Sequence, residues 1–282
     1  MNGHPGGELI REVGRIAAAA AELIMQVRGR AALGGSIAQQ SKPDHSPVTE
    51  ADLAAHQLIA AELRRLTPGV PVLSEEAAEV DFETRSSWSR FWLVDPLDGT
   101  KEFLAGRDDF TVNIALIEGH HPILGVVQVP PTGVCYSGIV GTGAWRRDSP
   151  GATPQAIHIA ERSMTPVRVA GSRSHRGTSL DGFLQRLGTN ELFPIGSSLK
   201  FCLLAEGGAD VYPRLGPTSE WDTAAGHAVL AAAGGQVRRI DGASLLYNTQ
   251  RDWVNPYFIA FGPTDHDWLS LVKDLAGRTE TA

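Results

Sequence analysis

Apolar residues recur at helical spacing near the start of the chain. Within residues 8–28 one face of a predicted helix carries Leu9, Val13, Ile16, Ala20, Leu23 and Val27. A second helix is predicted to begin after Thr49, with Thr49 as N-cap and Asp52 at the third helical position, and its apolar stripe is Leu53, Leu58, Ile59 and Leu63. Between these helices, residues 29–46 are rich in Gly, Ser and Gln, which predicts a loop.

The rest of the chain alternates between strand and helix patterns. We predict strands at 70–73, 91–94, 111–117, 123–129, 134–139, 167–170, 210–212, 236–240 and 255–261. Helices are predicted at 178–187, 197–206, 223–233 and 265–275, and a polar connector at 81–89. The alternation around a central antiparallel meander predicts a layered α/β sandwich in two halves. The polar segment 147–163 divides them, into an N-terminal α+β subdomain (1–150) and a C-terminal α/β subdomain (151–282).

Composition narrows the class of protein. The chain has 282 residues, of which 42% are hydrophobic and 20% charged, as in ordinary globular proteins. Its net charge of −7 argues against a broad nucleic-acid-binding surface. No run is long enough for a membrane span, and charges interrupt the N-terminus, so we expect no signal peptide and a cytosolic location. The two cysteines, Cys135 and Cys202, are expected to be buried free thiols.

Two carboxylates follow directly after the apolar run Phe-Trp-Leu-Val. Asp95 and Asp98 stand in the sequence Asp-Pro-Leu-Asp-Gly-Thr, and a carboxylate at the end of a buried strand is costly unless it is paired or binds a metal. Carboxylate oxygens are hard ligands that favour Mg²⁺, Ca²⁺ or Mn²⁺. Pro96 and Gly99 let the loop curl so that the Leu97 carbonyl oxygen joins the ligands. The structural alternative is a helix-capping Asp followed by a turn Asp.

Further acids lie in distant parts of the chain. Glu75 follows the predicted strand 70–73, Asp222 precedes a run of small residues that predicts a helix, and Asp52 lies on the second helix. The combination of these acidic elements with the Asp-Pro-Leu-Asp motif predicts a metal site. The alternatives are an N-cap role for Asp222 and a surface position for Asp52.

Other polar residues are candidates for binding a phosphorylated substrate. Thr100 offers a hydroxyl at the start of a segment with free backbone N–H groups, or else serves as an N-cap. His175, Lys200 and Arg214 are candidates for binding additional anionic groups. Their ordinary alternatives are a loop His, a helix-surface Lys and a strand-end Arg. Lys200 lies in Gly-Ser-Ser-Leu-Lys-Phe, where small residues such as Ser197 let a helix N-terminus approach a ligand.

Several motifs together resemble a known family. Ser-Glu-Glu at 74–76, Trp-Leu-Val-Asp-Pro-Leu-Asp-Gly-Thr-Lys-Glu-Phe at 92–103 and Trp-Asp-Thr-Ala-Ala-Gly at 221–226 resemble the signatures of the lithium-sensitive, Mg²⁺-dependent inositol monophosphatase superfamily. Its 3′(2′),5′-bisphosphate nucleotidase branch is the fuller match, through residues 46–52, 98–103, 110–116, 196–202 and Tyr-Pro-Arg at 212–214. The similarity runs from about residue 12 to 261. It implies a layered αβαβα sandwich.

The resemblance also implies roles for individual residues. Glu75, Asp95 and the Leu97 carbonyl would bind one Mg²⁺, and Asp95, Asp98 and Asp222 a second. Asp52 and Thr100 would orient and deprotonate the attacking water, with a third ion near Asp52, and Glu75 joins them as a catalytic residue. The full set of substrate-contacting residues implied is Glu75, Leu97, Asp98, Gly99, Thr100, His175, Ser197, Lys200, Arg214 and Asp222.

The implied activity is hydrolysis of the 3′-phosphate of adenosine 3′,5′-bisphosphate to AMP, which recycles a by-product of sulfate assimilation. The implied second substrate is 3′-phosphoadenosine 5′-phosphosulfate. Two alternatives stay open, namely an inositol- or sugar-phosphate phosphatase with the same metals and a catalytically idle nucleotide-binding regulator. Neither the choice between monomer and homodimer nor an association with the inner membrane surface follows from the sequence.

Overall fold

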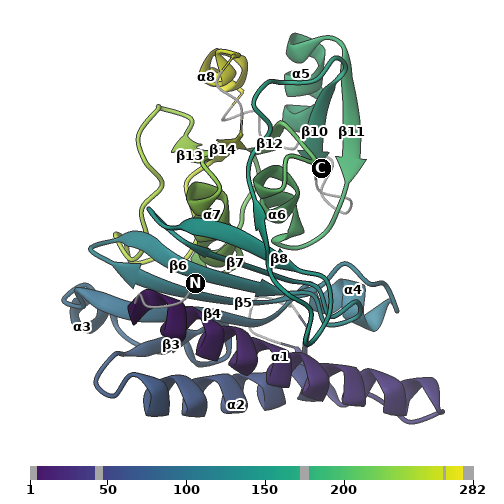
Figure 1. The fold of residues 1–282 in the computed structure, drawn as a ribbon, viewed down its shortest axis with the longest axis vertical. Coiled ribbons are helices and arrows are strands. Elements are labelled where there is room, and N and C mark those ends of the chain that lie inside the picture. Colours follow the sequence, from purple (N-terminus) through teal and green to yellow (C-terminus); the bar gives the residue numbers. More distant parts are fainter. Residues whose placement is uncertain (1–4, 42–46, 172–177, 263–264, 276–282) are drawn as a thin grey trace.

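The computed structural model describes residues 5–41, 47–171, 178–262 and 265–275 and forms five alternating layers (Figure 1). Helices α1 and α2 cover a seven-stranded sheet, helices α6 and α7 lie between this sheet and a five-stranded sheet, and α5 and α8 cover the far side. The predicted layered αβαβα sandwich is therefore confirmed. Of its three apolar cores, one lies between α1, α2 and the first sheet, one surrounds α6 and α7 between the two sheets, and one lies between the second sheet and α5 and α8.

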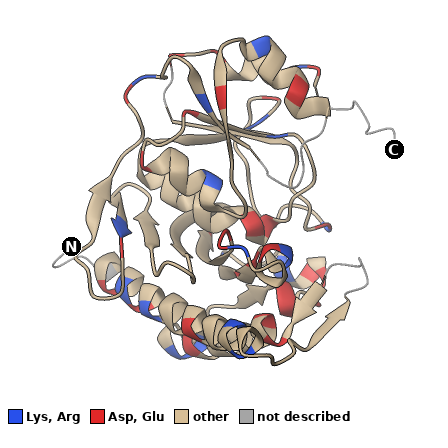
Figure 2. Ribbon diagram, turned by 90° about the vertical axis from the view of Figure 1, so that its right-hand side faces the viewer, with Lys and Arg blue, Asp and Glu red and all other residues tan. Residues whose placement is uncertain are grey.

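The outer layer consists of α1 (Pro5–Ala32) and α2 (Glu50–Leu66). Thr49 and Asp52 form the predicted capping box at the start of α2. Both signs of charge are interspersed along these two helices, which lie at the bottom of Figure 2, and Arg15 and Arg65 each pair with Glu62. This mixture gives the outer layer no broad basic face of the kind that nucleic acid requires.

The first sheet has the order β3-β4-β5-β6-β7-β8-β9 and is antiparallel apart from the β3–β4 pair. Side chains alternate between its faces, so that Phe91 and Leu93 enter the inner core and Trp92 and Val94 the core beneath α1 and α2. Its strands are β3 (Val72–Ser74), β4 (Arg90–Asp98), β5 (Thr111–Glu118), β6 (His121–Gln128), β7 (Cys135–Ile139), β8 (Gly143–Arg147) and β9 (Gln155–Ile157).

The second sheet has the order β11-β10-β12-β14-β13. Its strands are β10 (Val167–Gly171), β11 (Asn190–Pro194), β12 (Val211–Arg214), β13 (Gln236–Arg239) and β14 (Phe258–Phe261). The helices on either side of it are α5 (Thr178–Leu187), α6 (Leu199–Ala205), α7 (Glu220–Ala232) and α8 (Trp268–Val272). The predicted helix 178–187 is confirmed with the same bounds.

Several elements differ from the prediction. Helix α1 continues through residues 29–32, and β1 (Gln39–Ser41), which lies in the predicted loop 29–46, pairs with β2 (Pro47–Thr49) directly after it. The connector 81–89 contains the short helix α3 (Phe82–Arg85), and the strands β8, β9 and β11 were not predicted. The first sheet ends with β9 and the second begins with β10, while the division into subdomains near residue 150 stays a prediction.

Two further expectations can be compared with the structure. Cys135 and Cys202 are both buried and free, as predicted. Within the described part of the chain, no helix combines the length and the apolar character needed to cross a membrane.

Candidate functional site

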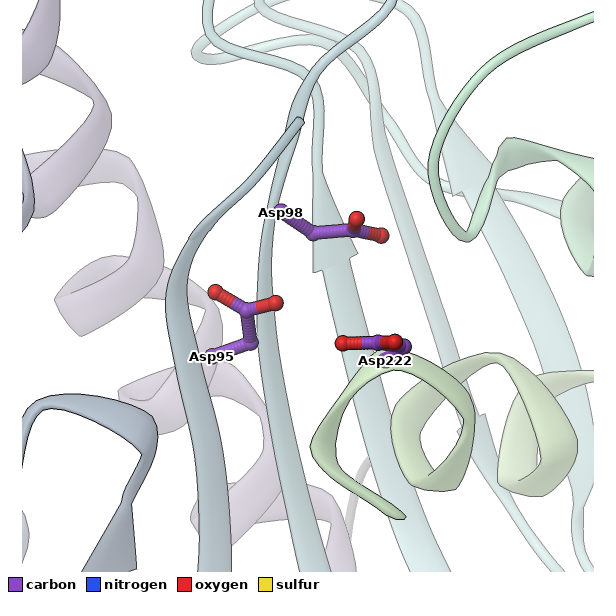
Figure 3. Close-up of side chains that lie close together, drawn as sticks. All are labelled: Asp95, Asp98 and Asp222. Atoms are coloured by element: carbon purple, nitrogen blue, oxygen red, sulfur yellow. The ribbon is translucent and has the colours of Figure 1, made fainter. Parts of the chain in front are cut away.

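Three carboxylates from the two halves of the chain converge at the carboxyl end of β4 (Figure 3). The candidate ligand atoms of Asp95, Asp98 and Asp222 all lie within 4.8 Å of one another. Residues three apart on a regular strand face opposite sides, but the register of β4 against β5 shifts between Asp95 and Asp98. This irregularity lets both carboxylates face the same space, into which Asp222 extends from the first turn of α7.

One oxygen of Asp98 and one of Asp222 are fixed by hydrogen bonds. Oδ2 of Asp98 accepts from the hydroxyl of Ser197 at 2.8 Å and the backbone N–H of Ser198 at 2.7 Å. Oδ2 of Asp222 accepts from the Thr218 hydroxyl at 2.7 Å and the Ser219 N–H at 2.9 Å. In the described part of the chain, no donor is recorded for the second oxygen of Asp98 or Asp222, so each acid is oriented with one oxygen left for a metal.

The N-cap alternative for Asp222 is wrong in detail, because Ser219 is the N-cap and Asp222 is the third helical residue of a capping box. This happens because α7 begins at Glu220, before the run of small residues that predicted it. The side chain of Asp222 thereby closes the first turn with one oxygen and extends into the site with the other.

Burial and mutual repulsion raise the pKa values of the strand carboxyls. The pKa of Asp95 is raised well above its usual range by burial, and then by the charges of Glu75, Asp98 and Asp222. Burial, followed by the charge of Asp222, raises the pKa of Asp98 to about 6. A bound cation relieves both costs, because it neutralises the repulsion and replaces the lost hydration. The all-oxygen donor set fits a hard divalent cation.

Glu75 and Leu97 extend this donor set. Glu75 begins a single 3₁₀ turn (Glu75–Ala77) directly after β3, which runs parallel to β4. It lines the same pocket as Asp98 and Asp222, and its charge and hydrogen bond contribute to the raised pKa of Asp95. The carbonyl oxygen of Leu97 accepts a hydrogen bond from the Thr100 hydroxyl at 3.3 Å. Glu75 therefore lies beside Asp95 and lines the pocket, and the Leu97 carbonyl lies beside Thr100. Their roles as metal ligands stay predictions.

Asp52 and Thr100 form a second pair at the edge of the cluster. The Thr100 hydroxyl donates to Oδ1 of Asp52 at 3.1 Å, while Oδ2 of Asp52 accepts from the N–H and hydroxyl of Thr49. Asp52 is 1% exposed, so the surface alternative is wrong, and burial raises its pKa despite these hydrogen bonds. Gly99, with a φ of 100°, is the N-cap of α4 (Thr100–Leu104), so Thr100 is free of the cap role.

Asp98 and Asp222 open into a pocket of about 270 Å³ that is also lined by three positively charged residues, Lys101, Lys200 and Arg214. Its lining includes Asp98, Gly99, Thr100, Ser197, Lys200, Tyr212, Arg214 and Asp222. Lys200 is 5% exposed, so the helix-surface alternative is wrong, and its Nζ donates to the Ser197 carbonyl oxygen. Burial lowers the pKa of Lys200 to about 8, with Asp98 opposing the shift and Arg214 adding to it.

Arg214 lies at the end of β12 and donates to the Pro217 carbonyl oxygen. Its Nε is buried and has no hydrogen-bond partner among the described residues. Lys200 and Arg214 therefore place two positive groups in the pocket beside the carboxylates. His175 lies outside the described residues.

Sequence reasoning missed the residues that support the acids. Thr111 and Asn113 are buried polar residues on β5. The Thr111 hydroxyl contacts Ser197 and Ser198, and Nδ2 of Asn113 donates to Asp98 at 3.3 Å. Two polar residues at alternate positions of an otherwise apolar strand were the available signal, because such groups are retained in a core only with partners.

The known proteins that this chain resembles point to one family. Residues 8–266 match the model of the inositol monophosphatase family. The protein 3′(2′),5′-bisphosphate nucleotidase CysQ of Escherichia coli O157:H7 is 49% identical over 250 residues, which are 89% of this chain and 98% of that protein. The protein of the same name from Haemophilus influenzae is 35% identical over 236 residues, covering 82% of this chain and 86% of that protein.

Solved structures with a similar fold point to the same family. A crystal structure of CysQ from Bacteroides thetaiotaomicron, described as a bacterial member of the inositol monophosphatase family, gives a TM-score of 0.78 at 37% identity. It covers 90% of this chain and 97% of that one. The inositol monophosphatase of Anabaena gives a TM-score of 0.74 at 24% identity, covers 95% of this chain and 96% of that one, and shows the likeness of fold alone.

Proposed function

The chain belongs to the inositol monophosphatase family, and on this premise we propose that it is a 3′(2′),5′-bisphosphate nucleotidase. The reaction is hydrolysis of the 3′-phosphate of adenosine 3′,5′-bisphosphate to AMP and phosphate, with 3′-phosphoadenosine 5′-phosphosulfate as a second substrate. The observation that carries the proposal is the presence of Lys200 and Arg214 in the same pocket as Asp98 and Asp222. A substrate with two separate anionic groups uses both parts of this pocket.

The residues at the cluster suit two Mg²⁺ ions. Glu75, Asp95 and the Leu97 carbonyl would bind one ion, and Asp95, Asp98 and Asp222 the other. When bound, the ions neutralise the phosphoryl oxygens, lower the pKa of a bound water and stabilise the leaving alkoxide. The four acids carry four negative charges, which two divalent cations balance, so that a phosphate is attracted rather than repelled.

Asp52 and Thr100 would position and deprotonate the attacking water. The Thr100 hydroxyl donates to Oδ1 of Asp52, so its own oxygen remains able to accept a hydrogen bond from water. A proton taken from that water passes to Thr100 as the Thr100 proton passes to Asp52. Burial raises the pKa of Asp52, which makes its carboxylate a stronger base. A third, weaker ion beside Asp52 belongs to the same proposal.

Lys200, Arg214 and Ser197 would bind the 5′-phosphate and the nucleoside. The desolvated ammonium of Lys200 and the unpartnered Nε of Arg214 both gain an anionic partner when the 5′-phosphate enters. Ser197 has a left-handed backbone conformation (φ 55°) and bonds Asp98. It therefore links the nucleotide part of the pocket to the metal part. We retain His175 as a proposed nucleotide contact.

A phosphate-release panel with Mg²⁺ tests this function. Adenosine 3′,5′-bisphosphate should be hydrolysed with a higher kcat/KM than inositol 1-phosphate or fructose 1,6-bisphosphate. Arg214→Ala should raise KM for the bisphosphate, because the 5′-phosphate loses a charged partner. An unchanged KM in this variant would favour the inositol- or sugar-phosphate alternative. The idle-regulator alternative is disfavoured because every acid of the expected set is present.

The sequence-based expectations of a cytosolic location, and of a monomer or homodimer, stay predictions.

A further inference from the structure

A buried arginine outside the pocket connects the two halves of the molecule. Arg85, at the end of α3, is 1% exposed and precedes β4 by five residues. Its guanidinium donates to the side chain of Asn248 and to the carbonyl oxygens of Gln250 at 2.9 Å and Arg251 at 2.6 Å. It also lies 3.7 Å from the centre of the Trp253 ring. One side chain of the first half thus binds most of the segment 248–253 of the second half.

That segment in turn encloses the start of α7. Both carboxylate oxygens of Glu220 accept the Asn248 N–H at 2.9 Å, and the Glu220 N–H donates to the Trp253 carbonyl oxygen at 2.8 Å. Asn255 donates to the carbonyl oxygens of Thr218 and Ser219. The Trp253 ring lies 5.5 Å from that of Trp221, the neighbour of Asp222. Residues 248–255 therefore fix the turn that carries Asp222.

The metal site needs such a connection. Asp95 and Asp98 belong to β4 in the first half, whereas Asp222 belongs to α7 in the second. Three carboxylates whose oxygens lie within 4.8 Å of one another repel, and this repulsion tends to separate the halves when no cation is bound. A contact that holds α7 against the first half offsets this repulsion, and it lowers the reorganisation that cation binding requires.

We propose that Arg85 is a positioning residue of the metal site. It fastens the segment 248–255 to α3, this segment fastens the first turn of α7, and the turn holds Asp222 at the distance from Asp95 and Asp98 that a divalent cation requires. This inference rests on the metal dependence in the proposed function. Arg85 does not line the pocket, so its effect on cations acts through Asn248, Trp253 and Glu220.

If Arg85 served only to stabilise the fold, its replacement would have a different effect on cation binding. A purely structural Arg85 lowers the stability of the fold when it is replaced, but leaves the affinity of the folded protein for cations unchanged. Arg168 provides a matched control because it is also largely buried and makes comparable bonds, to Asp210 and to the Gly207 carbonyl oxygen. These bonds lie within the second half and include no residue of the pocket.

The experiment is a titration of the full chain with Mn²⁺ in the absence of substrate, with free Mn²⁺ measured by electron paramagnetic resonance. Relative to the unchanged protein, Arg85→Met should raise the Mn²⁺ dissociation constant by at least about tenfold. Arg85→Lys should recover part of the loss, because it restores a positive donor. Arg168→Met should bind Mn²⁺ as the unchanged protein does, even though its unfolding midpoint falls.

A milder variant keeps the test decisive if Arg85→Met does not fold. Asn248 has a φ of 58°, which glycine adopts without strain, so Asn248→Gly removes both side-chain bonds to Arg85 and preserves the backbone. It should also weaken Mn²⁺ binding. Unchanged affinity in folded Arg85→Met or in Asn248→Gly, or an equal loss in Arg168→Met, overturns the proposal. Because no substrate is present, a different substrate preference in the phosphate-release panel leaves this result untouched.

Discussion

The buried ammonium of Lys200 makes substrate binding sensitive to pH in the alkaline range. Burial lowers the pKa of Lys200 to about 8, and the Asp98 charge only partly opposes this shift. Only the protonated form attracts a 5′-phosphate, so deprotonation above pH 8 removes the charge that we assign to this group. We therefore expect KM for adenosine 3′,5′-bisphosphate to rise as the pH increases from 7 to 9.

The size of this effect follows from the pKa. With a pKa of about 8, roughly nine-tenths of the lysines are charged at pH 7 and roughly one-tenth at pH 9. If only the charged form binds the 5′-phosphate, KM rises by up to about tenfold, which corresponds to about 1.4 kcal/mol. The phosphate itself contributes little to the change, because its second pKa of about 6 lies below this range.

Two comparisons make the assay specific. Adenosine 3′-monophosphate lacks the 5′-phosphate, so its KM should not follow the same rise. In Lys200→Arg the guanidinium stays charged throughout the range, so the rise for the bisphosphate should disappear. A full rise retained in Lys200→Arg, or a rise of the same size for the monophosphate, would refute the role of Lys200, because the titrating group would then lie elsewhere.

Three further predictions concern the metal site and the core. Asp95→Asn should lower Mg²⁺-dependent phosphate release by about a hundredfold, and a phosphate assay that finds most of the rate retained excludes the two-ion assignment. Gly125→Val should lower the urea midpoint by an amount equivalent to about 1–3 kcal/mol, because a Cβ at Gly125 would lie 2.3 Å from the Ala225 carbonyl oxygen. Gly14→Ala, whose Cβ meets nothing within 4 Å, is the control and should not destabilise the fold. Burial lowers the pKa of His227 to about 3, so the folded state keeps this side chain neutral while the unfolded chain protonates near pH 6.5. Urea unfolding should show stability falling by about 1.4 kcal/mol per pH unit below pH 6.5, and His227→Gln should remove that component.

Elements whose sequence signals lie within a few neighbouring residues were predictable. The capping box of Thr49 and Asp52 and the helix Thr178–Leu187 were both predicted from short stretches of sequence. Asp95 and Asp98 were predicted to bind a metal because carboxylates at the end of a buried strand require partners, whereas the ligand role of Asp222 was implied by the family resemblance; the ligand roles themselves stay predictions. For these features the determining interactions lie within one element or follow from the chemistry of one side chain.

Features that depend on distant partners were not predictable. Arg85 stands in a polar stretch that reads as a solvated connector, yet it is buried against Asn248, a partner 163 residues away. The supporting bonds from Ser197 and Ser198 to Asp98 cross about one hundred residues. No local pattern records such pairings, since the hydrogen-bond partner of a polar residue is decided only when the layers assemble.

The convergence of the acids depends on positions in the sheet that carry no chemistry. Gly125 on β6 and Gly138 on β7 lie directly beneath α7, and a Cβ at Gly138 would lie 2.9 Å from Cα of Val229. Larger side chains at these positions would lift α7 from the sheet and carry Asp222 away from Asp95 and Asp98. Close contact here brings the third acid to the site, and Arg85 then secures the turn that carries it. The acids proposed as metal ligands are therefore readable from the sequence, whereas their spacing is a property of the packing between α7 and the first sheet.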